Sequence, residues 1–109
     1  ISLVMDPQIL KRLEEKYIPP ISEYHQDEAL NEVVWFIPRK YTEKKTKNGK
    51  IYWIVEVTDN SSQLTNIKCW GVDPKKDKIW FNRPYLGKLQ HDDWGFSTRS
   101  IKYNFKLLG

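Results

Sequence analysis

The sequence of 109 residues predicts a mainly β protein, a small closed or nearly closed barrel that follows an N-terminal helix. Three patterns support this prediction. Residues 51–58 alternate between two faces, one of them wholly apolar, as a half-buried strand does. Asn48-Gly49, just before them, is the strongest hairpin signal in the chain. Aromatic and β-branched residues, which favour strands, are frequent in segments 33–37 and 94–107.

Residues 1–32 are expected to form a helix and an acidic connector. Asp6 is a good N-cap, and Pro7 suits the first helical position. One apolar stripe at helical spacing consists of Ile9, Leu10, Leu13 and Tyr17. Pro19-Pro20 is expected to end the helix, because proline removes a helical hydrogen bond. A short helical turn is expected around Asp27–Asn31.

Residues 33–109 are expected to form the barrel domain. The first strand covers Val33–Ile37. Pro38 then predicts either a sheet edge or a bulge, because proline cannot donate a ladder hydrogen bond. In the second strand, Ile51–Thr58, Trp53 shares the apolar face and is assigned to the core.

The third strand is expected at Leu64–Trp70, and the chain after it leaves two alternatives open. Asp73-Pro74 either caps a short helix or opens a turn into a strand at residues 78–81. Tyr85–Leu89 is expected to be a short helical turn, and Trp94–Leu107 to be one long bent strand or two short ones. This order fits a five-stranded Greek-key OB-fold with a helical insertion between its third and fourth strands.

The net charge of +4 is an average over two unlike segments. Residues 1–32 carry three bases against seven acids, whereas residues 33–109 carry fifteen bases against seven acids. The second segment therefore has a net charge of +8, and it also holds 13 of the 15 aromatic residues. Basic and aromatic side chains together favour an anionic partner such as nucleic acid, with a merely solvated basic surface as the alternative.

Several classes of protein are excluded by the motifs that the sequence lacks. The single cysteine, Cys69, cannot form an internal disulfide and is expected to be buried and inert. The chain has no phosphate-binding loop, nucleophile elbow or His-Glu-x-x-His motif, and no apolar stretch long enough to span a bilayer. His91-Asp92-Asp93 is interpreted as a polar turn in preference to a divalent metal site. No cofactor, metal or membrane partner is expected.

Three segments carry a resemblance to a known family. They are Lys44-Lys45-Thr46-Lys47-Asn48-Gly49-Lys50, Ile54-Val55-Glu56-Val57-Thr58-Asp59 and Asn66-Ile67-Lys68-Cys69-Trp70. Together they resemble the anticodon-type OB-fold nucleic-acid-binding domain, most closely its form near the C-terminus of bacterial and phage DNA polymerase III alpha subunits. The resemblance covers roughly residues 33–90. The sequence departs from the pattern at Asn60-Ser61-Ser62, where the family has glycine, and at Gly71, where it has proline.

This resemblance implies a binding face on strands two and three and on the loop between strands one and two. The implied stacking platforms for bases are Tyr41, Tyr52 and Trp70. The implied phosphate-binding residues are Arg39, Lys40, Lys44, Lys45, Lys47, Lys50 and Lys68. Tyr52 has the alternative role of covering a barrel edge, and Trp70 that of a hydrophobic plug. Glu56 shares the predicted face and would repel phosphate.

The sequence therefore predicts a non-enzymatic module that binds single-stranded nucleic acid, with DNA the expected form. Because the chain starts at Ile1 and stops at Gly109, we expect it to be part of a larger replication protein such as a replicative DNA polymerase. The alternative is a protein–protein interaction module of a replication or repair assembly. A monomer in the cytoplasm is expected in either case.

Overall fold

The computed structural model describes residues 6–24 and 33–108. The helical turn predicted at residues 27–31 lies outside this described part. The elements are α1 (Pro7–Glu15), the 3-10 turn η1 (Ile21–Glu23), β1 (Val33–Lys45), β2 (Ile51–Thr58), β3 (Thr65–Cys69), β4 (Tyr85–Lys88), β5 (Gln90–Asp92), β6 (Gly95–Thr98), α2 (Ile101–Asn104) and β7 (Phe105–Leu107).

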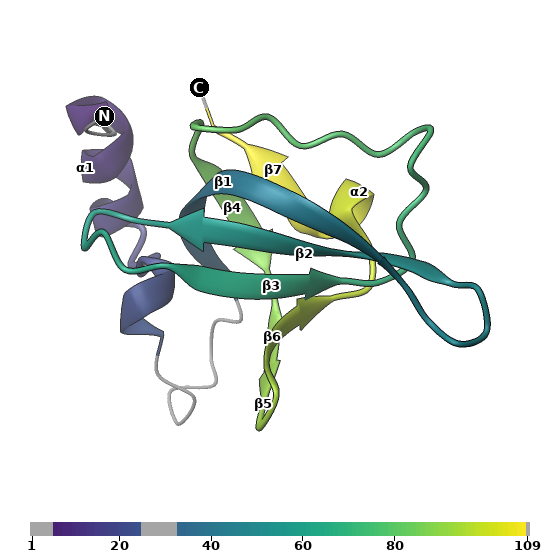
Figure 1. The fold of residues 1–109 in the computed structure, drawn as a ribbon. Helices are drawn as coiled ribbons and strands as arrows, with labels where there is room; N and C mark the ends of the chain where they lie inside the picture. Colours follow the sequence, from purple (N-terminus) through teal and green to yellow (C-terminus); the bar gives the residue numbers. More distant parts are fainter. Residues whose placement is uncertain (1–5, 25–32, 109) are drawn as a thin grey trace.

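The protein is mainly β, and its strands form one mixed sheet that curls into a half-barrel (Figure 1). The strand order is β5-β6-β3-β2-β1-β4-β7, so the described residues hold seven strands and the prediction of five is wrong. β3 and β6 pair in parallel, whereas the other pairs are antiparallel. β1 is long enough to pair with β4 through its first residues and with β2 through its last.

The predicted helical insertion after the third strand is also wrong, because residues 71–84 form turns without helix or strand. A single turn forms where the carbonyl of Asp73 accepts hydrogen bonds from Lys76 N and Asp77 N at 3.0 and 2.8 Å. The chain then leaves the turn, and Trp80 N donates to the hydroxyl of Tyr85 at 2.8 Å.

The chain after residue 84 also differs from its predicted pattern. Residues 85–88, expected as a helical turn, form β4 between β1 and β7. Of the two alternatives predicted for residues 94–107, two short strands form, β6 and β7. The unpredicted helix α2 lies between them, and its N-cap Ser100 accepts a hydrogen bond from Tyr103 N. The short helix thus exists, but it lies after β6 instead of after β3.

A bulge in β1 decides which side chains face the interior. The pairing of β1 with β2 shifts by one residue between Pro38 and Lys40, which confirms the bulge alternative predicted from the proline. Before the bulge, Phe36 faces the main core, and after it, Tyr41 lies opposite the buried Val55. Because strand side chains alternate, the extra residue exchanges the two faces of β1.

The main hydrophobic core fills the inside of the curled sheet. Its buried side chains include Phe36, Trp53, Val55, Ile67 and Cys69. Trp53 is only 3% exposed and lies with Val55 and Val57, which confirms its assignment to the core. The inward face predicted for the third strand is likewise confirmed by the buried Ile67 and Cys69.

A second, smaller core lies on the outside of β1, where α1 packs. Leu13 of α1 is buried against Trp35 and Ile37, so the first half of β1 is covered on both faces. The helix begins as predicted, with Asp6 Oδ1 accepting from Gln8 N at 2.9 Å. It ends at Glu15, two residues before the expected end of its apolar stripe, because Tyr17 adopts a positive φ of 58°. Tyr17 is therefore 85% exposed.

Two further contacts attach the N-terminal segment to the sheet. Trp35 N donates to the carbonyl of Pro19 at 3.0 Å, and Ser22 N donates to Asp59 Oδ2 at 2.9 Å. In the described part of the chain, no helix is long and apolar enough to cross a membrane.

Candidate nucleic-acid interface

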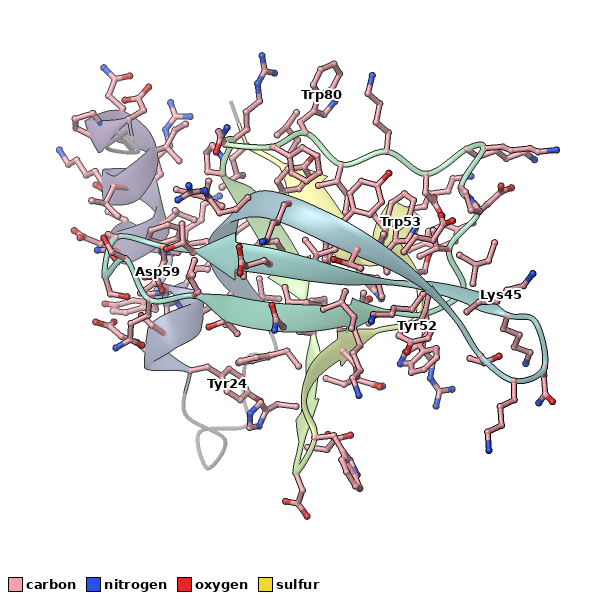
Figure 2. All side chains as sticks on the ribbon, viewed as in Figure 1. Tyr24, Lys45, Tyr52, Trp53, Asp59 and Trp80 are labelled. Carbon is pink, nitrogen blue, oxygen red and sulfur yellow. The ribbon has the colours of Figure 1, made fainter. Side chains whose placement is uncertain are left out.

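The predicted binding residues lie on two opposite faces of the hairpin that β1 and β2 form. Tyr52 and Trp53 are neighbours in β2 and therefore point to opposite sides of the sheet (Figure 2). Trp53 faces the core. We call the other side, which carries Tyr52, the outer face. It is formed by the alternate residues of β1, β2 and β3 that point away from the core.

Tyr52 and Trp70 lie together on the outer face. Their ring centroids are 4.4 Å apart and the ring planes differ by 29°, so the rings are stacked on each other. Tyr52 is partly exposed, and Trp70 keeps 36% of its surface accessible. Each ring covers one side of the other, which fixes the orientation of both and leaves apolar ring surface available to a ligand.

Three of the predicted phosphate-binding lysines share this outer face. Lys44 lies directly opposite Tyr52 across the β1–β2 ladder, and Lys68 of β3 lies opposite Ile54. Cross-strand partners point to the same side of a sheet, so both lysine side chains project from the face that carries the aromatic pair. Lys40 lies farther along the same face, opposite Glu56.

Glu56 is the one carboxylate predicted to disfavour phosphate on this face. Its Oε2 lies 3.9 Å from Lys40 Nζ, so an opposite charge partly offsets it. Glu56 is four residues along β2 from Tyr52, a separation of about 13 Å at the rise of a strand. The acidic group therefore lies at the other end of the outer face from the aromatic pair.

The β1–β2 hairpin loop carries two more of the predicted lysines. Thr46 closes the loop, with its N–H donating to the carbonyl of Lys50 at 2.8 Å and its own carbonyl accepting from Gly49 N at 2.9 Å. Gly49 has a φ of +84°, a conformation that glycine adopts without a steric penalty. This confirms the hairpin predicted from Asn48-Gly49. Lys47 and Lys50 are exposed on the loop, and Arg39 is exposed at the bulge.

Tyr41 and Lys45 are not brought together with the aromatic pair. Both belong to the set of β1 residues that face the same side as Trp53. The ring of Tyr41 lies 4.4 Å from that of Trp53 and 5.8 Å from that of Phe81. Glu43 lies beside them and accepts a hydrogen bond from Trp53 Nε1 at 3.1 Å. The bulge in β1 is the cause, since it moves residues 41 and 45 to the inner side.

Trp94 is a candidate that the sequence left without a role. It lies in the β5–β6 turn and is 85% exposed. With Lys68 and Trp70 it lines a shallow hollow of about 160 Å³ on the outer face. The sequence could have indicated this exposure, because a tryptophan that follows two aspartates and precedes a glycine is expected to lie in a surface turn.

Cys69 and the segment His91-Asp92-Asp93 are the remaining residues whose side chains could carry chemistry. Burial, with a smaller contribution from the charge of Asp77, raises the pKa of the Cys69 thiol to about 12. This agrees with the predicted buried and inert cysteine. His91 and Asp92 belong to β5 and Asp93 to the following turn, where Asp92 Oδ1 accepts from Trp94 N at 2.8 Å. Over residues 6–24 and 33–108, no cluster of three potential metal ligands is found.

A scan against protein-family models and searches of curated proteins and of solved structures found no match to this chain.

Proposed function

We propose that this chain is an OB-fold-type module that binds single-stranded DNA through the outer face of β2 and β3. One observation carries the proposal: the stacked pair of Tyr52 and Trp70 lies partly exposed on the same face as the neighbouring Lys44 and Lys68. Aromatic rings that stack on bases, within a basic surface that follows the phosphates, are the two devices of sequence-tolerant single-strand binding.

The strand connections support the OB-fold part of the proposal. β4 and β5 are separated by Leu89 alone, so they act as one bent strand that reaches from β1 to β6. With β4 and β5 taken together, five strands follow one another around the curled sheet in the order β1-β2-β3-β6-β5/β4, and β7 is added at the edge of β4. A five-stranded Greek-key barrel is the architecture of the OB-fold, whose second and third strands form its binding face.

Base stacking would provide most of the binding free energy. A base placed on the open side of the Tyr52–Trp70 pair gains roughly 1 to 3 kcal/mol, judged from alanine substitutions in other single-strand binders. Because the two rings hold each other, little side-chain freedom remains to be lost on binding. Trp94, across the hollow from Trp70, offers a further ring to the next base.

Phosphate binding would add a salt-dependent contribution. If three lysine side chains each displace counterions from a single strand, the logarithm of the affinity falls with the logarithm of salt at a slope of about −2. A rise from about 50 to about 200 mM salt then weakens binding roughly 20-fold. Any three of the four candidates, Lys44, Lys68, Lys47 and Lys50, would give this slope.

The decisive experiment is a fluorescence-anisotropy titration of labelled oligo(dT) with the full chain. Substituting Tyr52→Ala and Trp70→Ala together is expected to weaken binding by about 5- to 150-fold, the equivalent of losing one stacked base. Tyr103→Ala is the matched control, because Tyr103 is 81% exposed on α2 and lies outside the outer face. Binding that survives the double substitution, or that does not change with salt, rules the proposal out.

We further propose that the parent protein is a replicative DNA polymerase, in which the module would hold the template strand while other domains perform the chemistry. The polymerase resemblance of residues 33–90 is the support for this step. Sequencing the gene on both sides of the coding region for this chain tests it. Flanking sequence without polymerase motifs would contradict it and leave the binding proposal intact.

A second candidate function, a protein–protein interaction module, is favoured by the aromatic cluster on the inner side. Tyr41 is 43% exposed and Phe81 36%, and their stacked rings present apolar surface away from the outer face. Exposed aromatic residues are frequent binding hot spots for proteins. Absence of oligonucleotide binding at low salt would favour this second function, whereas oligonucleotide binding that depends on Tyr41 and Phe81 would indicate a nucleic-acid site on the inner side.

A further inference from the structure

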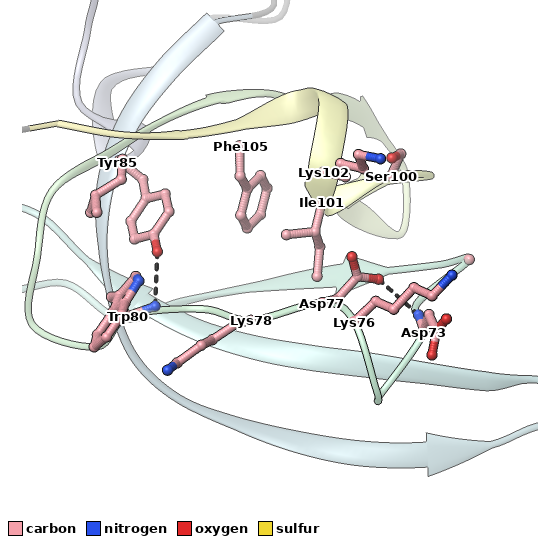
Figure 3. A pocket seen from close by; sticks show the side chains of 12 residues that line it. Asp73, Lys76, Asp77, Lys78, Trp80, Tyr85, Ser100, Ile101, Lys102 and Phe105 are labelled. Atoms are coloured by element: carbon pink, nitrogen blue, oxygen red, sulfur yellow. Dashed lines mark hydrogen bonds between the residues drawn. The ribbon is translucent and has the colours of Figure 1, made fainter.

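A cleft separate from the outer face lies between segment 71–80 and the C-terminal elements α2 and β7 (Figure 3). Its volume is about 600 Å³, within the range of small-molecule sites. Segment 71–80 forms one wall, and the turn into α2 forms the other. Neither Tyr52 nor Trp70 lines it, and none of the predicted nucleic-acid-binding residues does.

The floor of this cleft is apolar and rigid. It consists of Tyr85, Ile101 and Phe105, which are 4%, 5% and 9% exposed and belong to the main core. The rings of Tyr85 and Phe105 lie 6.1 Å apart at an angle of 59°. Trp80 N donates a hydrogen bond to the hydroxyl of Tyr85, and this bond holds the phenol ring in its orientation (Figure 3).

Trp80 stands at one end of the cleft with 46% of its surface exposed. The Nζ atom of Lys78 lies 4.1 Å from the centre of the Trp80 ring, and the guanidinium carbon of Arg83 lies 5.3 Å from it. Two cationic side chains therefore lie against the Trp80 ring. A ligand that joins an aromatic ring to an anionic group could contact the indole and these cations together.

The rim is basic because its three lysines outnumber its two carboxylates. Lys76, Lys78 and Lys102 line the cleft together with Asp73 and Asp77. Asp77 Oδ2 accepts from Asp73 N at 2.7 Å, and Asp73 Oδ1 accepts from Lys75 N at 3.0 Å. The two acids thus stabilise the backbone of the turn, whereas none of the three lysines has a salt-bridge partner within the described residues.

We propose that this cleft binds a small planar aromatic anion, that is, an aromatic or heteroaromatic ring bearing a carboxylate or phosphate. The ring would lie on Tyr85 and Phe105 beside Trp80, where aromatic contacts add to the burial of apolar surface. The anionic group would lie among the lysines at the rim, where charge-assisted hydrogen bonds are strongest. An uncharged ring would make no charged contact with the rim lysines, and an anion without a ring would not cover the floor.

The test is an NMR titration of the full chain with three probes: naphthoate, adenosine monophosphate and adenosine. Naphthoate is an aromatic ring with a carboxylate, and the monophosphate is a heteroaromatic ring with a phosphate. The probe that binds more tightly identifies the preferred anion. We expect saturable shifts in the amide signals of residues 76–80 and 100–102. Adenosine, which lacks the anionic group, is expected to bind at least about tenfold more weakly.

Charge-reversal variants test which lysines bind the anionic group. Lys78→Glu and Lys102→Glu are each expected to weaken binding of the tighter probe by about tenfold, as the loss of one charge-assisted hydrogen bond does. Lys75→Glu is the matched control, because it makes the same change in the same turn at a residue that does not line the cleft. These side chains are exposed, so the variants are expected to fold.

Four results would overturn the proposal. They are no saturable binding of either naphthoate or adenosine monophosphate, equal binding of adenosine and its monophosphate, no effect of either cleft variant, and shifts centred on Tyr52 and Trp70. The inference does not rest on the proposed function. A chain that fails to bind oligo(dT) but binds naphthoate in the cleft would support it.

Discussion

Replacing Asp59 by asparagine is expected to loosen the attachment of the N-terminal segment to the sheet. Asp59 follows β2 and is 5% exposed. Its Oδ2 accepts from Ser22 N at 2.9 Å, and its Oδ1 accepts from Ser61 N at 2.8 Å and from Ser61 Oγ at 2.5 Å. The same carboxylate therefore holds both the turn after β2 and the 3-10 turn η1 of the leading segment.

The size of the effect follows from the donors that the carboxylate satisfies. In Asp59→Asn the amide nitrogen replaces one acceptor oxygen. If the remaining oxygen stays with the two donors of Ser61, the N–H of Ser22 faces another donor and loses its partner. An unsatisfied part-buried donor costs about 1 to 3 kcal/mol, so the free energy of unfolding at pH 7 is expected to fall by this amount.

The pH dependence identifies the carboxylate charge as the cause. Burial by itself raises the pKa of Asp59, but the hydrogen bonds from Ser22 and Ser61 outweigh it and hold the pKa below the ordinary value of 3.8. A lowered folded-state pKa stabilises the protein fully above the unfolded value and loses this stabilisation as the pH falls through the folded value. The difference between the native chain and Asp59→Asn is thus expected to persist down to about pH 4 and to shrink below it.

Urea unfolding from pH 7 to pH 2 measures this difference. Trypsin cleavage in α1, at Lys11 and Arg12, reports separately on release of the leading segment and is expected to accelerate in Asp59→Asn. Ser61→Ala is the control, because it removes the two hydrogen bonds of the Ser61 hydroxyl, to Asp59 Oδ1 and from Gln63 N, and leaves the bond to Ser22 in place. Equal stability of the two chains at pH 7, or a difference that stays constant to pH 2, would refute the reasoning.

Three further predictions concern the core and the outer face. Gly87→Ala is expected to lower the free energy of unfolding by about 1 to 3 kcal/mol, because the added Cβ would lie 2.3 Å from a ring carbon of the fully buried Phe36; an unchanged urea midpoint would contradict this. Cys69 is expected to resist iodoacetamide at pH 8 in the native state, since its pKa is raised to about 12 and the side chain is fully buried. Labelling of the native protein as fast as that of the urea-unfolded protein would contradict this expectation. Trp94→Ala is expected to weaken oligo(dT) binding by about fivefold or more without changing stability, as measured by anisotropy and urea unfolding; unchanged affinity would remove Trp94 from the interface.

Local patterns predicted the parts of the candidate site that depend on one strand or one turn. The alternation of β2 correctly separated Tyr52 from Trp53, because successive side chains of a strand must point to opposite sides. Asn48-Gly49 predicted the hairpin, whose glycine takes the left-handed backbone conformation. The same reasoning placed Cys69 inside, where it is fully buried.

The placement of Tyr41 shows where this reasoning stops. Pro38 indicated a bulge, but the sequence did not say that the extra residue would exchange the faces of the strand after it. Tyr41 therefore lies on Trp53 instead of beside Tyr52. The burial of Trp35 on the side of β1 away from the main core was equally hidden, because α1 covers it from a distant part of the chain.

The sequence by itself determined that this chain is mainly β, where its first strand begins and where its second and third strands lie, and that its basic and aromatic residues gather after residue 32. These properties follow from alternation, turn chemistry and composition, which act between near neighbours. The sequence did not show that β1 continues past Ile37 to Lys45. The tertiary structure alone decided that β3 pairs in parallel with β6, that α2 interrupts the last strands, and that a basic cleft opens beside segment 71–80. Those features depend on contacts between residues far apart in the chain, for which a local pattern carries no signal.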